Sequence, residues 1–190
     1  MFDNLKKNLG MYSPTEKALI SMLKDIEIFK DFNEKQLYEL SKKFKLEKYL
    51  KDVKIVNEWE LYGKIWLLES GNIKVFKKIT WNNIQLWEVM KWEIFGEMAF
   101  FTNNLPMATL ISYENCIVWE IWYEDFKQIL EKYPEVYQKI IETIKKRHSQ
   151  NVEILEEIKN NPNLYNKHYQ TWTTEEQEEI QTIKVNIKIS

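Results

Sequence analysis

The chain has 190 residues, of which 44% are hydrophobic, so it is long enough and apolar enough to fold around a core. Its 27 basic and 29 acidic residues give a net charge of −2, which provides no basis for a polyanionic partner such as DNA. The single cysteine, Cys116, excludes an internal disulfide and a multi-cysteine zinc site. The sequence shows neither a signal peptide nor an apolar run near the roughly 18 to 20 residues that span a bilayer. We therefore expect a cytoplasmic protein without a membrane segment.

Two short amphipathic helices are predicted near the N-terminus. Residues 13–16 read Ser-Pro-Thr-Glu, which is typical of a helix start with a capping side chain, a proline in the first turn and a glutamate three residues after the cap. This helix is expected to extend to about Leu23. A second start reads Asn-Glu-Lys-Gln at 33–36, and Leu37, Leu40 and Phe44 then follow at the spacing of one helix face.

From about Phe44 the pattern changes to short runs rich in β-branched and aromatic residues. Polar or glycine turns interrupt these runs every 8 to 12 residues, which is typical of a β-sandwich or barrel. The clearest predicted strands cover residues 54–56, 65–68, 73–77, 84–89, 109–112 and 116–121.

The pattern becomes helical again at 123–126, and Pro134 begins a longer helix that is expected to run to about Lys159. Side chains spaced alternately by four and three residues form a seam on this helix: Tyr137, Ile141, Ile144, His148, Asn151, Leu155 and Ile158. The first half of the seam is better interpreted as packing on the barrel than as a dimeric coiled coil, whereas the second half has less barrel to cover. Residues 161–190 are mostly polar and are expected to form a loosely ordered tail.

One stretch distinguishes among the possible barrels. Residues 95–101 read Phe-Gly-Glu-Met-Ala-Phe-Phe, and Ala108-Thr109 follow at the start of a predicted strand. This stretch resembles the phosphate-binding cassette of the cyclic nucleotide-binding domain family. The similarity extends over about residues 26–150 and includes residues 58–75, which resemble the family's second and third strands with their hydrophobic-Ser-Gly turn at Leu68-Glu69-Ser70-Gly71.

The resemblance implies a mainly β fold with flanking helices, namely the jelly-roll-like β-roll of that family followed by a long C-terminal helix. The corresponding divisions are an N-terminal helical extension at 1–25, the β-roll with short helices at 26–133, the long helix at 134–160 and the polar tail at 161–190.

The resemblance also assigns candidate ligand-binding positions. A glycine lets backbone approach a ligand closely, and backbone N–H groups after it are suited to an anionic phosphate. In the family the cassette glutamate accepts from a ribose hydroxyl and an arginine pairs with the cyclic phosphate. Here the arginine position holds Pro106, Met107 follows it, and Arg147 is the only arginine of the chain. The candidate positions are Phe95, Gly96, Glu97, Met98, Ala99, Pro106, Met107, Ala108 and Thr109.

Metal-dependent chemistry and catalysis are not predicted. The cupins share a similar barrel, but they place metal-binding histidines on strands, and no histidine precedes His148 here. Cys116 is expected to be a strand residue, since no base is paired with it. We expect a protein that is not an enzyme and has no cofactor.

Two functional classes remain open. The first is a regulatory protein that senses a cyclic nucleotide, cAMP or cGMP, or a related small anion, and signals through its C-terminal helix. The second is a ligand-free β-roll that acts as a dimerisation or protein-interaction module through that helix. About 30 residues follow the long helix, too few for the DNA-binding domain of the family's transcription factors.

The chain has only 4 glycines but 8 tryptophans. Trp59, Trp81 and Trp92 stand at turn positions where the family has glycine, Trp87 is a weaker case, and Trp66 stands where the family has an aromatic residue. A bulky side chain is costly in turns that need positive φ. This pattern leads to the hypothesis that the source organism reads UGA as glycine, so that these tryptophans are glycines in the native protein.

Overall fold

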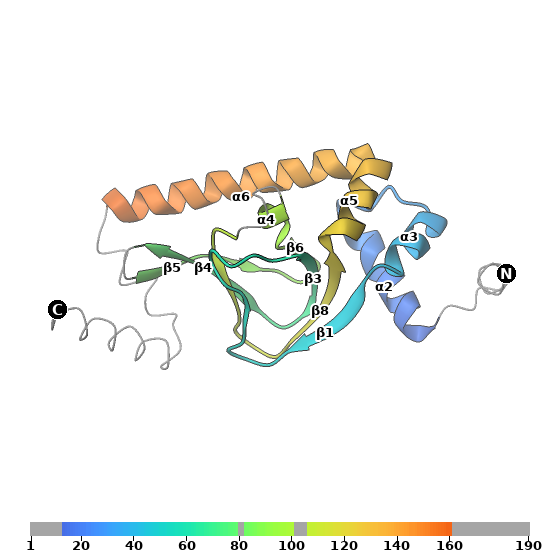
Figure 1. Cartoon of the computed structure of the whole chain (residues 1–190), viewed down its shortest axis with the longest axis horizontal. Helices are drawn as coiled ribbons and strands as arrows, with labels where there is room; N and C mark the ends of the chain where they lie inside the picture. The colour runs from blue at the N-terminus through green and yellow to red at the C-terminus, as the bar shows by residue number, and fades with distance from the viewer. Residues whose placement is uncertain (1–12, 80–81, 101–105, 161–190) are drawn as a thin grey trace.

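The structure, a computed structural model, describes residues 13–79, 82–100 and 106–160 (Figure 1). Two helices open it, α2 (Pro14–Asp25) and α3 (Glu34–Ser41), as predicted. Each begins with a capping box, in which Ser13 and Asn33 cap the helix and exchange hydrogen bonds with Glu16 and Gln36 three residues on. The N-terminal extension was expected to begin at residue 1, but residues 1–12 lie outside the described residues.

The strands of the described part form two antiparallel four-stranded sheets. One sheet has the order β1-β8-β3-β6 and the other β2-β7-β4-β5. Their bounds are β1 (Lys45–Tyr49), β2 (Lys54–Val56), β3 (Lys64–Ser70), β4 (Ile73–Ile79), β5 (Asn82–Val89), β6 (Ile94–Phe95), β7 (Thr109–Ser112) and β8 (Cys116–Trp122). The sheets fold into the predicted β-roll, and Cys116 is a buried strand residue.

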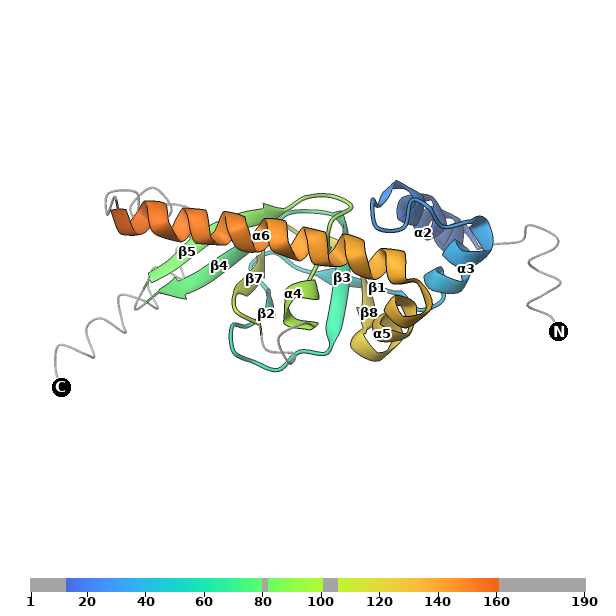
Figure 2. The same cartoon turned by 90° about the horizontal axis from the view of Figure 1, so that it is seen from above.

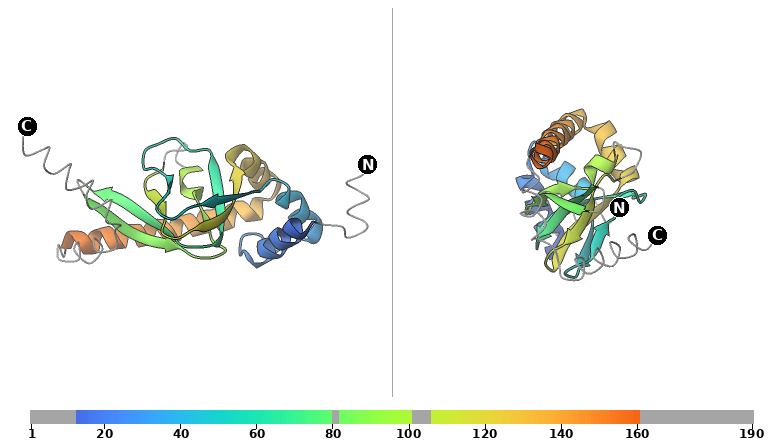
Figure 3. Two further views of the ribbon diagram at one scale, coloured as in Figure 1. Left: turned by 90° about the horizontal axis from the view of Figure 1, so that it is seen from below. Right: turned by 90° about the vertical axis from the view of Figure 1, so that its left-hand side faces the viewer.

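Three further helices complete the described chain: α4 (Glu97–Phe100), α5 (Tyr123–Lys132) and α6 (Pro134–Asn160). The long helix α6 lies along one side of the β-roll, and Figure 2 shows it passing from α5 across α4 toward β4 and β5. The two views of Figure 3 place it on the same side of the roll. The predicted tail at 161–190 lies outside the described residues. None of the described helices combines the length and the apolar character that crossing a membrane requires.

Buried side chains gather in two main clusters. One joins α2, α3, α5 and the start of α6 to the outer side of β3 and β8, and it includes Leu23, Phe29, Phe126, Val136 and Ile140. The other fills the interior of the β-roll, with Ile55, Trp66, Leu68, Phe95 and Val118 among its members. The first half of α6 therefore packs on the domain, but through Val136 and Ile140 rather than through Tyr137 of the predicted seam, which is 40% exposed.

Candidate functional site

The predicted cassette lies where β6 ends and α4 begins. Gly96 has a φ of +83°, a conformation that L-residues with side chains rarely adopt. A Cβ added at this position would lie 2.7 Å from Cζ3 of Trp66, so the close approach also requires glycine. Phe95 is fully buried and its ring stacks on Trp66 at a centroid distance of 5.4 Å. The glycine thus turns the chain directly over the core of the roll and places Glu97 at the start of α4.

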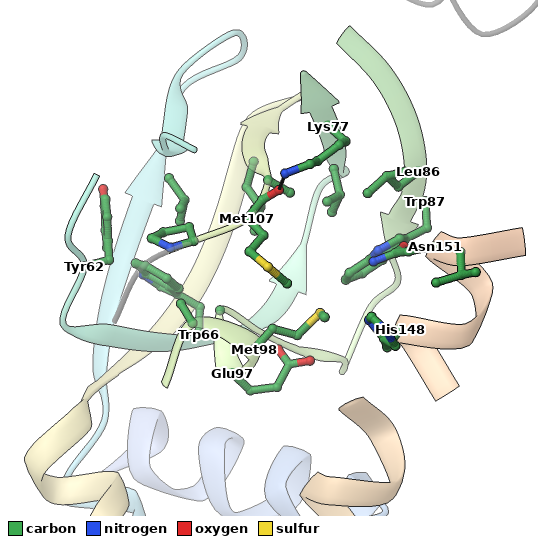
Figure 4. Close-up of a pocket in the computed structure, with 18 of the residues that line it drawn as sticks. Tyr62, Trp66, Lys77, Leu86, Trp87, Glu97, Met98, Met107, His148 and Asn151 are labelled. Carbon is green, nitrogen blue, oxygen red and sulfur yellow. Dashed lines mark hydrogen bonds between the residues drawn. The ribbon is translucent and has the colours of Figure 1, made fainter. Parts of the chain in front are cut away.

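A cavity of about 250 Å³ opens beside this turn, between the roll and α6 (Figure 4). The residues that line it come from the cassette, from the strands and from the second half of α6. They are Val56, Tyr62, Trp66, Val75, Lys77, Leu86, Trp87, Gly96, Glu97, Met98, Ala99, Pro106, Met107, Ala108, Leu110, Tyr123, His148, Asn151, Val152 and Leu155. Figure 4 shows Met98 and Met107 extending into the cavity, with Trp66 on one side and Trp87 on the other.

Most of the predicted site residues therefore meet in one place. Seven of the nine line the cavity, while Phe95 and Thr109 do not. Phe95 supports the site from the core, and the hydroxyl of Thr109 accepts a hydrogen bond from the backbone N–H of Glu58 at 3.1 Å. The prediction of Phe95 and Thr109 as contact residues is thus not supported by the cavity, and their positions indicate structural roles.

Glu97 is the charged centre of the cassette, and its residue is only 1% exposed. Its carboxylate accepts a hydrogen bond from the guanidinium of Arg147, which reaches it from α6. Burial raises the pKa of Glu97 above its ordinary value, and the charge of Arg147 opposes this rise. The pair joins the cassette to the long helix.

Arg147 has two further contacts at the same point. Its guanidinium lies over the ring of Trp87 at 4.4 Å, and Nη2 is 3.6 Å from a carboxylate oxygen of Glu93. Reasoning from the sequence missed this residue, because Arg147 is 50 positions away from Glu97 and outside every cassette motif. The only available signal was that the single arginine of the chain lay on the helix through which the protein was expected to signal.

The position that carries the family's arginine contributes no charge here. Pro106 is buried, and its carbonyl accepts a hydrogen bond from the backbone N–H of Trp59 at 3.0 Å. The carbonyl of Met107 accepts from Nζ of Lys77 at 2.7 Å. Lys77 also binds the Glu58 carboxylate, which is 6% exposed. This lysine is therefore engaged beside the cassette and does not replace the missing guanidinium.

His148 lies on α6 with an exposed side chain and lines the cavity at the same time. It was expected to have a surface or seam role, and the structure places it on the part of the seam that faces the roll. Within the described part of the chain, no three His, Cys, Asp or Glu side chains come together in a way that could hold a metal ion.

Two of the tryptophans have the backbone conformation that the glycine hypothesis predicts. Trp59 has a φ of +69° and Trp92 a φ of +70°, both in turns. Trp87 lies within β5 and is not among the residues with positive φ, so its position does not call for glycine. Trp81 lies outside the described residues. Trp66 is buried in the core, as expected of a genuine aromatic position.

Comparison with known proteins decides the family of this β-roll. Residues 46–133 match the model of the cyclic nucleotide-binding domain. The chain contains a cyclic nucleotide-binding domain. The cAMP-dependent protein kinase regulatory subunit of Candida albicans is 33% identical over 114 residues, which cover 60% of this chain and 24% of that protein. The chain thus spans about a quarter of that relative.

Solved structures show the same fold. The regulatory subunit of a cAMP-independent protein kinase A from Trypanosoma brucei superposes with a TM-score of 0.62 at 18% identity, covering 75% of this chain and 51% of that one. The corresponding subunit from Trypanosoma cruzi, bound to guanosine, has a TM-score of 0.58 at 15% identity and covers 68% and 50%. This cyclic nucleotide-binding domain therefore shares its overall fold with them.

Proposed function

We propose that this domain is a regulatory sensor, which binds a nucleotide-derived small molecule in the cavity and signals through α6. One observation carries the proposal: the cassette and the long helix both line the same cavity. Gly96, Glu97 and Met98 line it from the cassette, while Asn151 and Leu155 line it from α6. A ligand in this cavity contacts both walls at once.

The energetic consequence follows from this shared lining. A ligand shifts a conformational equilibrium only by the difference between its affinities for the two states. A molecule bound between the cassette and α6 has different contacts when α6 lies on the roll and when it moves away. Occupancy of the cavity and position of the helix are therefore coupled.

The relatives support the ligand class. The Candida albicans protein is by name a cAMP-dependent kinase regulatory subunit, and the Trypanosoma cruzi subunit holds guanosine. Both ligands contain a purine and a ribose. The cassette glutamate, Glu97, is present in this cavity to accept a ribose hydroxyl, whereas the phosphate-binding arginine is replaced by Pro106. We thus expect a ligand that contains a nucleoside.

Isothermal titration calorimetry of the full chain with cAMP, cGMP, adenosine and guanosine tests the proposal. We expect saturable binding of at least one of the four, together with a change in amide hydrogen exchange across residues 147–160. Glu97→Gln should weaken that binding, because the amide is a poorer acceptor for a hydroxyl than the carboxylate. Glu93→Gln is the matched control, since Glu93 contacts Arg147 but does not line the cavity.

The opposite results are equally clear. If none of the four ligands gives heat or a thermal shift at about 1 mM, where binding free energies are near −4 kcal/mol, the sensor proposal is wrong. The domain would then be a dimerisation or protein-interaction module. Sedimentation equilibrium of the ligand-free chain measures its molecular mass and so tests whether it forms a dimer. Unchanged affinity in Glu97→Gln would place the site elsewhere.

A further inference from the structure

We infer that the cavity selects an uncharged ligand, a nucleoside or a similar neutral heteroaromatic molecule, over its phosphorylated forms. The inference rests on the proposed function, because it assumes that the cavity binds a ligand. It is carried by the charges around the cavity and by the polar groups there that have no partner.

Within the described part of the chain, Lys77 in the cavity lining and Arg147 beside it are both already paired. Lys77 is the only lysine or arginine among the described lining residues, and it binds the buried carboxylate of Glu58 and the carbonyl of Met107. Arg147 binds Glu97 and lies over Trp87. The cassette residues between Phe100 and Pro106 are Phe, Thr, Asn, Asn and Leu, none of which has a positive charge. A phosphate in this cavity would have to displace an existing ion pair to find a cation.

The cavity also contains an acidic group and a largely apolar wall. Glu97 is buried there beside Arg147, and burial raises the pKa of its carboxyl above the ordinary value. Val56, Met98 and Leu110 are among the apolar side chains that line the cavity. A buried anion without a partner is strongly unfavourable, and a second negative charge near Glu97 adds repulsion.

Two uncharged polar groups of the described lining have no hydrogen-bond partner. Oδ1 of Asn151 and Nε1 of Trp87 are buried and have no hydrogen-bond partner. Both residues line the cavity, and Figure 4 shows them on the same side of it. One atom is an acceptor and the other a donor, so they fit a ligand that offers both an N–H and an acceptor but no charge. The side chains of Tyr62, Trp66 and Trp87 add aromatic surface to the lining, although Phe95 stacks on Trp66 and Arg147 lies over Trp87.

The size of the cavity is consistent with such a ligand. About 250 Å³ is below the roughly 300 to 1,000 Å³ that is usual for pockets holding drug-sized molecules. A nucleoside is smaller than its cyclic phosphate and leaves no charged group to accommodate. The neutral polar groups, the aromatic rings and the volume thus point to the same class of ligand.

The test compares ligands that differ only in the phosphate. Calorimetry of the full chain with guanosine against cGMP, and with adenosine against cAMP, should show at least one nucleoside binding about ten-fold or more tightly than its cyclic phosphate, a difference within the usual cost of an unpaired polar contact. The nucleoside affinity should change little with salt concentration, since screening acts only on charged ligands. A cyclic phosphate that binds as tightly as its nucleoside, or more tightly, overturns the inference and leaves the sensor proposal standing. Failure of all four to bind removes the sensor proposal itself.

A reciprocal variant tests the charge directly. Pro106→Arg should raise the affinity for the cyclic phosphates by about ten-fold, the size expected of a charge-assisted contact, without a matching gain for the nucleosides. Pro106→Gln is the matched control, because it introduces a long polar side chain without charge. If both variants raise cyclic phosphate affinity equally, charge is not what selects the ligand and the inference is wrong. Circular dichroism of each variant verifies that the fold is retained.

Discussion

The two halves of α6 are held to the same domain by different kinds of contact. In the first half, Val136 and Ile140 are fully buried in the cluster that they share with α5 and the N-terminal helices, and Ile144 packs against it. In the second half, Ile154 and Leu155 are only partly buried against the roll. The second half contributes instead the buried ion pair between Arg147 and Glu97. Figure 2 shows the two halves over different parts of the fold.

This difference assigns different roles to the two halves. Hydrophobic burial is not directional, and a small ligand does not compete with it. An ion pair is directional, and its carboxylate is also the group in the cavity best placed to accept from a ligand hydroxyl. The first half is therefore an anchor, and the proposed function requires the second half to be the part of α6 whose position responds to the cavity. The boundary between the two halves lies near Arg147, which is the first residue of the second half.

The largest effect is expected in the anchor. Ile140→Ala should lower the free energy of unfolding by about 2 to 5 kcal/mol, because it removes a fully buried side chain and leaves a cavity. Ile154→Ala is the matched control in the second half and should cost less than about 1 kcal/mol, since its side chain is only partly buried. Urea denaturation of both variants measures the contrast. Equal losses would show that the two halves are anchored alike.

An intermediate effect is expected at the ion pair. Arg147→Leu leaves the Glu97 carboxylate buried without a partner, which usually costs about 3 to 5 kcal/mol in rigid surroundings. We expect about 1 to 2 kcal/mol here, because the second half can move away and expose Glu97 to water at the lower cost of a local opening. Hydrogen exchange should accelerate in residues 148–160 and stay unchanged in 136–144.

The double variant separates the ion pair from other contacts of the arginine. Adding Glu97→Gln to Arg147→Leu removes the uncompensated charge, so it should recover part of the lost stability. Glu93→Gln, which affects a contact at 3.6 Å, should change stability by a few tenths of a kcal/mol at most. Faster exchange along the whole of α6 in Arg147→Leu would contradict the division into two halves.

The fold could be predicted from the sequence because its signals are local. Ser13 with Glu16 and Asn33 with Gln36 fixed both helix starts through contacts three residues apart. Alternating apolar runs located most of the strands. β1 was not among the clearest runs, since four of its five residues are exposed and it has no buried face to produce an alternation.

The site was only partly predictable, because half of it is assembled from distant segments. The cassette positions follow one another in the chain, and seven of the nine line the cavity. Lys77, Trp87, Asn151 and Arg147 come from strands and from α6, and no spacing rule connects them with Glu97. The seam on α6 did include Asn151 and Leu155, but its period shows only that they share a face, not what that face covers.

Apart from the Glu93→Gln control, the smallest effect concerns the turn that contains Trp92 and leads into Glu93. Trp92 immediately precedes Glu93, which contacts Arg147, and it has a φ of +70°. In ordinary positions glycine is less stable than alanine by about 0.5 to 1 kcal/mol, but at positive φ the preference reverses. Trp92→Gly should therefore be more stable than Trp92→Ala by about 1 kcal/mol in urea denaturation, since both variants lose the same packing.

Trp87 provides the matched control for this comparison. It is partly buried like Trp92 but lies in β5 without positive φ, so Trp87→Gly should be less stable than Trp87→Ala. A reversal at Trp92 and not at Trp87 indicates that the backbone, rather than the loss of an indole, sets the preference. It would also support the hypothesis that position 92 is glycine in the native protein, which the intact mass of the protein from its own host measures directly. If alanine is preferred at both positions, the turn at Trp92 tolerates a side chain without strain. Glu93 then contacts Arg147 from an unstrained turn, and the glycine hypothesis loses its support at position 92.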